Sequence, residues 1–342
     1  GINLHGFYFS NVLKFINWII KSFPMKKYSI SIVFVFCIQF VSAQNIDPTI
    51  EIATVKKHLY TLASDAMEGR QAGTLGIEKA AQYIETAFAD IGLTKYNDLP
   101  AYRQNFKANG LELFNVIGVL EGKSKKDEFV VISAHYDHLG VKKEGTGDLI
   151  YNGADDDASG TTAVLTLAQY FKDLGTNERT LIFVAFTAEE MGLLGSRHFG
   201  KDVDASQFIA GINIEMIGKH SSYGPNTAWL TGFDRSDFGT IIQKNLVGSS
   251  YTVHPDPYPT QRLFFRSDNA SLAELGIPSH TFSTVPIDTD VHYHQVSDEA
   301  ATLDMEIITQ TIRAIALGTQ SIINGEDTPT RVILAEGEGR RK

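Results

Sequence analysis

The sequence predicts a three-layer α/β/α fold, in which helices cover both faces of a central, mixed and mostly parallel sheet. Two observations predict it. Several apolar runs have the length of strands, and segments with a helical apolar period lie between them. Uniformly apolar strands suit a sheet that is covered on both faces. Alternation of strands with amphipathic helices is typical of the three-layer arrangement.

Five strands are expected, and each is an apolar-rich run that is followed by a polar residue. They are predicted at residues 115–120, 129–134, 181–186, 208–214 and 277–282. Ligands of this class of fold bind outside the carboxyl ends of the strands. The residues that follow each run are therefore the first place to look for a functional site.

Two helices are predicted from apolar residues at three- and four-residue spacings. One apolar stripe runs from Ile77 to Ile91 and ends before Gly92, a residue type favoured just after a helix. A second stripe includes Ile308 and Ile312. Neither a repeat nor a low-complexity linker interrupts the chain. We therefore expect one domain over residues 44–324 without an inserted domain, followed by a frayed polar tail over residues 325–342.

The first 43 residues are predicted to lie outside this domain. From Met25, two lysines are followed by an apolar run and by small residues that end at Ala43, which is the layout of a secretory signal peptide. The run is shorter than the roughly 20 residues that span a bilayer. Cleavage after Ala43 is therefore expected rather than stable membrane insertion, with an uncleaved anchor as the alternative. Residues 1–24 are interpreted as upstream sequence or an additional leader, and the mature chain as periplasmic or extracellular.

Charge and cysteine content exclude several classes of function. The formal net charge is −10, which argues against nucleic acid or an anionic membrane surface as the main partner. The single cysteine, Cys37, lies in the predicted signal, so a metal must be held by histidine, aspartate and glutamate. A serine nucleophile elbow and a complete dinucleotide-binding glycine loop are both missing from the sequence.

Histidine and aspartate residues follow the second predicted strand. His135 ends this strand, and Asp137 could accept the N–H of the ring nitrogen that a metal leaves free. An ordinary hydrogen-bonded pair is the alternative. Asp155, Asp156 and Asp157 then stand in a loop of small residues before a helix. Aspartates suit such turns, but three crowded carboxylates repel one another unless a cation offsets their charge.

Further acids and histidines follow the later strands. Glu189 and Glu190 stand where a strand gives way to a helix, and adjacent side chains point apart, so one could bind metal while the other acts as a general base. Glu215 ends an otherwise apolar run, where an unpaired carboxylate is costly to bury. His292 and His294 come after the last strand. Together the strand ends offer a ligand set that suits zinc.

In this order and spacing, the motifs resemble those of the co-catalytic zinc peptidases, a family that includes secreted bacterial aminopeptidases, glutamate carboxypeptidase and the glutaminyl cyclases. The motifs are AHYDHLG, NGADDDASG, FTAEEMGLLGS, INIEMIG and YHQVSDE, together with LASDAMEGR and the RSD stretch at residues 266–268. The resemblance covers essentially the whole chain after residue 43. It implies a zinc exopeptidase, nearest to the aminopeptidases, that acts on peptides with a free N-terminus.

The resemblance also implies roles for individual residues. The implied metal ligands are His135, Asp156, Glu190, Glu215 and His294. Asp156 would bridge two zinc ions, with a cis peptide bond to Asp157. Glu190 and His294 would be the other protein ligands of one ion, and His135 and Glu215 those of the second ion. A water or hydroxide would also bridge the ions. Glu189 matches the general base and Asp137 a second catalytic position, whereas many relatives carry aspartate in place of Glu215.

Two alternatives stay open at this stage. A glutaminyl cyclase would be an acyltransferase-like enzyme that uses a single zinc on the same scaffold, whereas complete ligands for two ions favour the peptidase. A metal-free binding protein on this fold should have lost ligands, and all five positions are filled here. Phe264 and Phe265, next to the RSD stretch, are expected to line an apolar pocket for the first side chain of the substrate. Core packing is the alternative for these two rings.

Overall fold

The computed structural model of this chain describes residues 49–335 and 338–339. The predicted signal peptide and the residues before it lie outside the described residues. Within the described ranges, none of the helices combines the length and the apolar character that crossing a bilayer requires.

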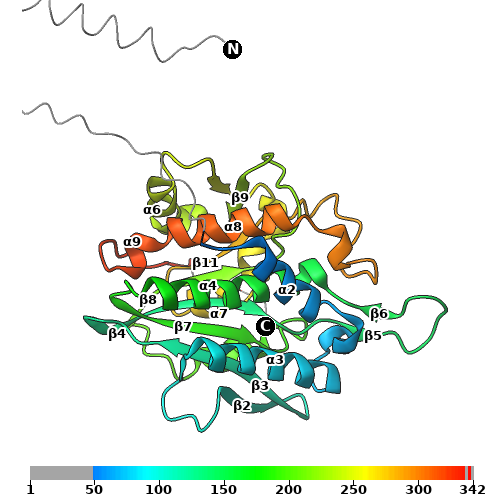
Figure 1. The fold of residues 1–342 in the computed structure, drawn as a ribbon. Helices are drawn as coiled ribbons and strands as arrows, with labels where there is room; N and C mark the ends of the chain where they lie inside the picture. Colours follow the sequence, from blue (N-terminus) through cyan, green and yellow to red (C-terminus); the bar gives the residue numbers. More distant parts are fainter. Residues whose placement is uncertain (1–48, 336–337, 340–342) are drawn as a thin grey trace, which may run out of the picture. The chain divides into compact units, whose positions relative to one another are not determined.

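A mixed sheet runs through the described part of the chain (Figure 1). Its strand order is β1-β3-β7-β4-β8-β11-β9-β10, and β2 pairs with residues 111–116 of β3. The strands are β1 (Thr94–Lys95), β2 (Arg103–Ala108), β3 (Leu111–Leu120), β4 (Lys125–His135), β7 (Arg179–Phe186), β8 (Phe208–Ile214), β9 (Thr227–Leu230), β10 (Thr252–Pro255) and β11 (Ser279–Ser283). A separate hairpin pairs β5 (Gly140–Val141) with β6 (Ile150–Tyr151).

The four central strands, β7, β4, β8 and β11, are parallel to one another. β3 pairs antiparallel with β7, and β9 pairs antiparallel with β11. This confirms the predicted mixed sheet with a parallel centre. The pairing of His135 with Phe186 brings the ends of β4 and β7 level. Because parallel strands end at the same edge of a sheet, the residues that follow all four strands converge there.

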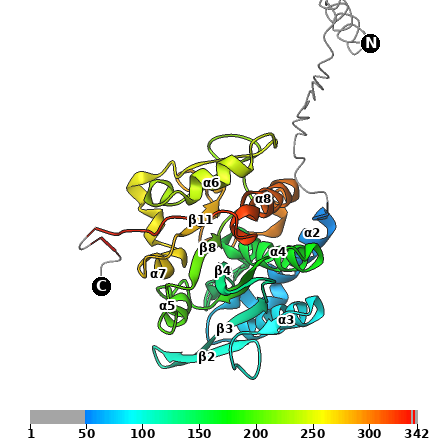
Figure 2. The same ribbon diagram turned by 90° about the vertical axis from the view of Figure 1, so that its left-hand side faces the viewer.

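Helices cover both faces of the sheet, as Figure 2 shows. α2, α3, α4 and α8 lie on one face, and α5 and α7 lie on the other. The helices are α2 (Ile52–Leu62), α3 (Leu75–Ile91), α4 (Gly160–Leu174), α5 (Leu194–Gly200), α6 (Phe238–Asn245), α7 (Asn269–Ala273), α8 (Met305–Gly318) and α9 (Gln320–Ile323). Successive residues of β7 enter different core clusters, with Phe183 facing α4 and Val184 facing α5. Both faces of the central strands are therefore buried, which explains their apolar runs.

The described part of the C-terminal segment is held against the domain, so the expectation of a frayed tail is wrong there. Buried Arg179 donates hydrogen bonds to the carbonyl oxygen of Asp327 and to the hydroxyl of Thr328, both at 2.7 Å. The backbone N–H of Val332 donates to Gly276, and the Val332 side chain joins a small apolar cluster. Because the segment's polar composition showed none of these long-range partners, sequence reasoning could not predict that it is anchored.

Candidate metal centre

The predicted site residues meet where the central parallel strands end. His135 is the last residue of β4, and Glu215 follows β8 directly. Glu189 and Glu190 lie in the turn between β7 and α5, and His294 lies in the loop after β11. The acidic loop reaches the same edge through η2 (Ala154–Ser159), the irregular turn that leads into α4.

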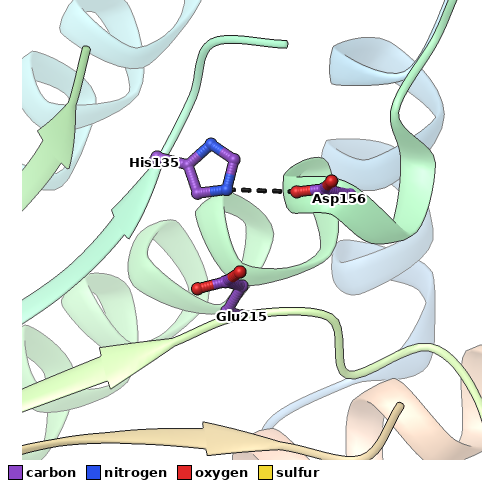
Figure 3. Close-up of side chains that lie close together, drawn as sticks. All are labelled: His135, Asp156 and Glu215. Carbon is purple, nitrogen blue, oxygen red and sulfur yellow. Dashed lines mark ion pairs between the residues drawn. The ribbon is translucent and has the colours of Figure 1, made fainter. Parts of the chain in front are cut away.

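One cluster joins His135, Asp156 and Glu215 (Figure 3). The imidazole Nε2 of His135 lies 3.1 Å from Oδ1 of Asp156, and one ligand atom from each of the three residues lies within 4.8 Å of the others. His135 and Asp156 are almost fully buried. Figure 3 shows Glu215 at the end of its strand, below the other two side chains.

A second cluster uses the other oxygen of the same aspartate. The imidazole Nε2 of His294 lies 3.2 Å from Oδ2 of Asp156 and 3.2 Å from Oε2 of Glu190. Nδ1 of His138 lies 3.0 Å from Oε1 of Glu190. Asp156 thus presents Oδ1 to one cluster and Oδ2 to the other, which is the geometry that a bridging carboxylate requires.

Several buried atoms of the residues around these two positions have no hydrogen-bond partner within the described structure. The unpaired buried atoms include His135 Nε2, both ring nitrogens of His138, Glu190 Oε1 and Glu215 Oε2. Each such group costs about 1–3 kcal/mol when it is left unsatisfied. Metal coordination would satisfy them, and a set of imidazoles and carboxylates without thiolates fits zinc.

The electrostatics of the site also favour a cation. Burial raises the pKa of the Glu189 carboxyl well above its usual range, with the charge of His135 opposing this effect and the charge of Glu215 adding to it. Burial likewise raises the pKa of Glu215 to about 7. Two buried carboxylates whose negative charges are disfavoured become stable anions beside a divalent ion.

The three successive aspartates have different surroundings. The carboxylate of Asp157 accepts backbone N–H bonds from Gly160 and Met216, and that of Asp155 accepts one from Gly218. Asp156 alone of the three points into both clusters. The peptide bond between Asp156 and Asp157 is cis, as the family resemblance implied. The flanking aspartates therefore hold the loop, and the middle one is left to bind metal.

A cavity opens beside the clusters. Asp156, Glu189, Glu215 and His294 form one wall of it. The apolar part of the lining consists of Met216, Trp229, Leu263, Val285, Ile287 and Tyr293. A molecule in this cavity can place an apolar group against these side chains while a polar group reaches the carboxylates.

Residues 115–318 match the model of Peptidase family M28. The chain belongs to this family. It is 25% identical over 231 residues to aminopeptidase YwaD of Bacillus subtilis, a match that covers 64% of this chain and 46% of that protein. It is 31% identical over 227 residues to leucine aminopeptidase 1 of Sclerotinia sclerotiorum, covering 62% and 54%. The chain thus spans about half the length of these two relatives.

Comparison with solved structures confirms the fold. The crystal structure of LapA from Legionella pneumophila superposes with a TM-score of 0.63 at 22% sequence identity. The match covers 81% of this chain and 74% of LapA.

The role expected for Asp137 in this M28 site needs correction. Nδ1 of His135 makes its hydrogen bond to the backbone carbonyl oxygen of Asp137, at 3.1 Å, whereas the nearer carboxylate oxygen is 3.8 Å away. The carboxylate instead accepts the backbone N–H groups of Glu189, at 3.0 Å, and Glu190, at 3.3 Å. Asp137 therefore positions the turn that carries the two glutamates.

The structure also places the two phenylalanines and the second histidine of the loop after β11. Phe264 and Phe265 do not line the cavity, because both are packed in a core cluster with residues of α7 and with Val332. Their expected role in substrate binding is therefore wrong, and core packing is correct. His292 turns away from the M28 site, and its Nδ1 lies 3.0 Å from the hydroxyl of Ser297.

Sequence reasoning missed two residues of the site. His138 is the second histidine of the motif AHYDHLG, and its position three residues after His135 was the only sign of a role. Arg70 ends the stretch LASDAMEGR and is fully buried. Its guanidinium donates to the carbonyl oxygens of Tyr136 at 2.9 Å, Asn152 at 2.6 Å and Gly153 at 2.8 Å. It thereby joins the end of β4 to the acidic loop, a contact that no local pattern indicates.

Proposed function

We propose that this chain is a zinc-dependent aminopeptidase that removes apolar residues from the N-termini of peptides. The observation that carries the proposal is the pair of ligand clusters that share Asp156 beside a cavity whose lining is partly apolar. Membership of Peptidase family M28 and similarity to two aminopeptidases support it.

The residues divide into two positions for zinc. One position has His135, Asp156 and Glu215. For the other, the family resemblance gives Asp156, Glu190 and His294, and Nε2 of His294 lies 3.2 Å from an oxygen of each carboxylate. Zinc at such positions lowers the pKa of water and polarises a carbonyl oxygen. Glu215 has the same charge and donor atoms as the aspartate of many relatives, and its carboxylate reaches the first cluster.

Glu189 is the general base in this proposal. Its side chain faces the cavity and belongs to neither cluster, whereas Glu190 lies within 3.2 Å of an imidazole. Glu189 accepts a proton from the water that adds to the scissile carbonyl carbon. It then gives that proton to the amide nitrogen as the C–N bond breaks, so the departing peptide leaves with a free amine.

The cavity accounts for the substrate. A free α-ammonium group is attracted to the carboxylates on one wall, and the first side chain then points toward Trp229, Val285 and Ile287. Burial of an apolar side chain of leucine size contributes about 1.5–3 kcal/mol. We therefore expect apolar first residues to be hydrolysed faster than charged ones.

A substrate panel with metal analysis tests the proposal. The panel contains aminoacyl nitroanilides, their N-acetylated forms and a peptide that begins with glutamine. We expect hydrolysis of leucyl or phenylalanyl substrates only when the amine is free, with two zinc ions per chain. Cleavage of the blocked forms alone would overturn the aminopeptidase assignment. Cyclisation of the glutamine peptide by a one-zinc protein would favour a glutaminyl cyclase, and a protein without zinc or turnover would favour a binding protein.

A further inference from the structure

The ligand assignment above leaves one buried imidazole beside the second zinc position without a role. We propose that His138 is a sixth protein ligand of the centre and completes the position formed by Asp156, Glu190 and His294. This inference rests on the zinc centre of the proposed function and goes beyond its five ligands. It makes the two positions chemically unequal.

The imidazole of His138 sits in a position that the surrounding chain has built for it. Its backbone N–H donates to the carbonyl oxygen of Arg70, and its side chain is fully enclosed. A methyl group on Gly153 would lie 2.5 Å from two ring carbons of His138, so only glycine lets the ring reach this place. The rings of Tyr151 and His294 approach it edge-on. Its orientation is thus fixed before any metal binds.

The Nδ1 atom of His138 faces the same point as the other ligand atoms. It lies 3.0 Å from Oε1 of Glu190 and 3.8 Å from Oδ2 of Asp156. Yet Nδ1 and Oε1 are not hydrogen-bonded to each other or to any other described group. Zinc–ligand distances of about 2.0–2.1 Å place neighbouring tetrahedral ligands about 3.3 Å apart, aimed at the metal rather than at each other. The contact between Nδ1 of His138 and Oε1 of Glu190 has a similar separation and no hydrogen bond.

His135 provides an internal comparison. Its Nε2 lies 3.1 Å from Oδ1 of Asp156 and is also buried without a hydrogen-bond partner. His138 therefore shares the features that mark His135 as a ligand. If His138 only oriented Glu190, an Nδ1–H···Oε1 hydrogen bond would be expected, and the geometry for it is missing between these two residues.

A ligand at His138 changes what each position can do. Asp156, Glu190, His138 and His294 supply four protein ligands, the number typical of a closed zinc site, whereas His135, Asp156 and Glu215 supply three and leave a place for substrate. Glu215 of the first position, His294 of the second and the shared Asp156 all line the cavity, whereas His138 and Glu190 do not. We expect the zinc near His138 to exchange more slowly than the other zinc.

X-ray absorption spectroscopy on tag-free, two-zinc protein tests the proposal by counting imidazoles. The expected count is three imidazoles for two zinc ions. In His138→Gln the count falls to two, and the affinity of one zinc falls at least tenfold in competition with a chelator. His292→Gln is the matched control, because it removes a nearby imidazole that faces Ser297, and it should change neither measurement.

A count of two imidazoles in the wild-type protein would overturn the role of His138 and leave the five-ligand centre intact. The same conclusion follows if His138→Gln binds both ions with an unchanged spectrum. A wild-type protein that binds no zinc would instead overturn the proposed function itself. Because the wild-type count does not depend on a variant, the proposal is testable even if His138→Gln fails to fold.

Discussion

Glu189 and Glu190 are adjacent in the chain but have different surroundings. The carboxylate of Glu190 lies between the imidazoles of His138 and His294. That of Glu189 faces the cavity instead. The carboxylate of Asp137 holds the backbone of both residues, so the turn that separates their side chains is fixed. Because the surroundings of the two glutamates differ, substitutions of Glu189 and of Glu190 should have different effects on zinc binding and turnover.

Glu189→Gln should retain both zinc ions and lose about 100- to 10,000-fold in kcat, because the amide cannot accept a proton from water. Metal content and turnover of a leucyl nitroanilide measure the two effects separately. Glu190→Ala serves as the comparison and should lose zinc as well as activity. Hydrolysis by Glu189→Gln at the wild-type rate would show that another group is the base.

His280, on β11, predicts a pH dependence of stability that is independent of the metal site. Burial lowers its pKa to about 4, and its ring bonds the carbonyl oxygen of Thr231 and the hydroxyl of Ser236. The unfolded chain therefore binds this proton between about pH 6.5 and 4 while the folded chain does not, so stability is lost as pH falls through that range.

The contribution of His280 to the free energy of unfolding should fall by about 1 kcal/mol between pH 7.5 and pH 5.5. Chemical denaturation at both pH values measures the change, and His280→Gln should reduce it by that amount. His292→Gln is the control. An equal pH dependence in the wild type and in His280→Gln would mean that folding leaves the pKa of His280 unchanged.

At the scale of elements, Arg70 ties three segments together. It ends η1 (Asp65–Arg70) and bonds the chain at the ends of α2 and β4 and in the acidic loop. Burial lowers its pKa to about 10, while Asp298 and other nearby aspartates favour its charged form. The guanidinium has several donors in a fixed plane, which a lysine ammonium cannot reproduce.

Arg70→Lys should therefore lower the free energy of unfolding by about 2–4 kcal/mol, because it leaves buried carbonyl oxygens unpaired. It should also weaken zinc binding about 10- to 100-fold, since the acidic loop loses its connection to β4. Denaturation of the metal-free protein and chelator competition measure the two effects. Arg262→Lys, at an exposed position, is the control; normal zinc affinity in Arg70→Lys would restrict Arg70 to a stabilising role.

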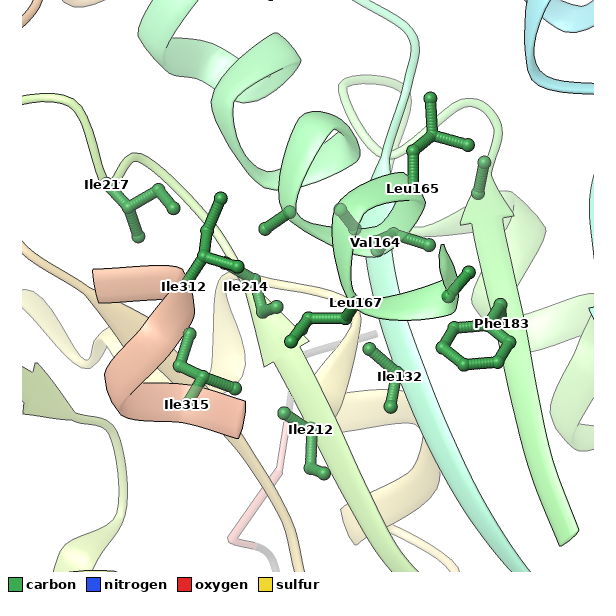
Figure 4. Packing of buried hydrophobic residues seen from close by; sticks show 14 of the residues in the cluster. Ile132, Val164, Leu165, Leu167, Phe183, Ile212, Ile214, Ile217, Ile312 and Ile315 are labelled. Atoms are coloured by element: carbon green, nitrogen blue, oxygen red, sulfur yellow. The ribbon is translucent and has the colours of Figure 1, made fainter. Parts of the chain in front are cut away.

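The helices and strands that were predicted best from the sequence are those in which the spacing of apolar residues shows which face is buried. Figure 4 shows residues of several such elements in one core, with Ile132 and Ile212 from the sheet, Leu167 from α4 and Ile312 from α8. The starts of strands were predicted less accurately: β3 begins at Leu111 and β4 at Lys125, each four residues before its predicted start, because strand pairing extends beyond the apolar run. Such pairings depend on the assembled fold.

The candidate site shows the same limit. Strand ends and acidic motifs indicated where the site would form, and the family resemblance selected the six residues from His135 to His294 that gather there. Three features could not be predicted, because each depends on which face a side chain presents after folding. They are the hydrogen-bond partner of His135, the core position of Phe264 and the hydrogen bonds that Arg70 makes to distant carbonyl oxygens. His138 was visible in the sequence but needed the structure to bring it beside Glu190.

At the scale of the whole molecule, the predicted signal peptide changes the charge of the protein. Residues 1–43 contain four lysines and no acids, so a chain that begins at Gln44 has a formal charge of −14 rather than −10. Expression in a Gram-negative host followed by N-terminal sequencing of the exported protein measures the cleavage. We expect Gln44 as the first residue; a protein retained in the membrane with residue 25 intact would support the uncleaved anchor.

Four of the forty acidic residues gather where zinc is expected, so removal of the metal should destabilise the domain as a whole. Asp156, Glu189, Glu190 and Glu215 lie at one sheet edge, and without a cation their buried charges repel one another. Metal that binds only the folded chain stabilises it by about 4 kcal/mol at a concentration 1,000 times its Kd. Treatment with a chelator should therefore lower Tm by about 8 °C or more, and zinc should restore it.

Asp156→Asn removes the shared ligand and should abolish the response, whereas Asp148→Asn, in the exposed hairpin, should preserve it. A wild-type Tm that does not respond to the chelator would contradict a resident zinc centre.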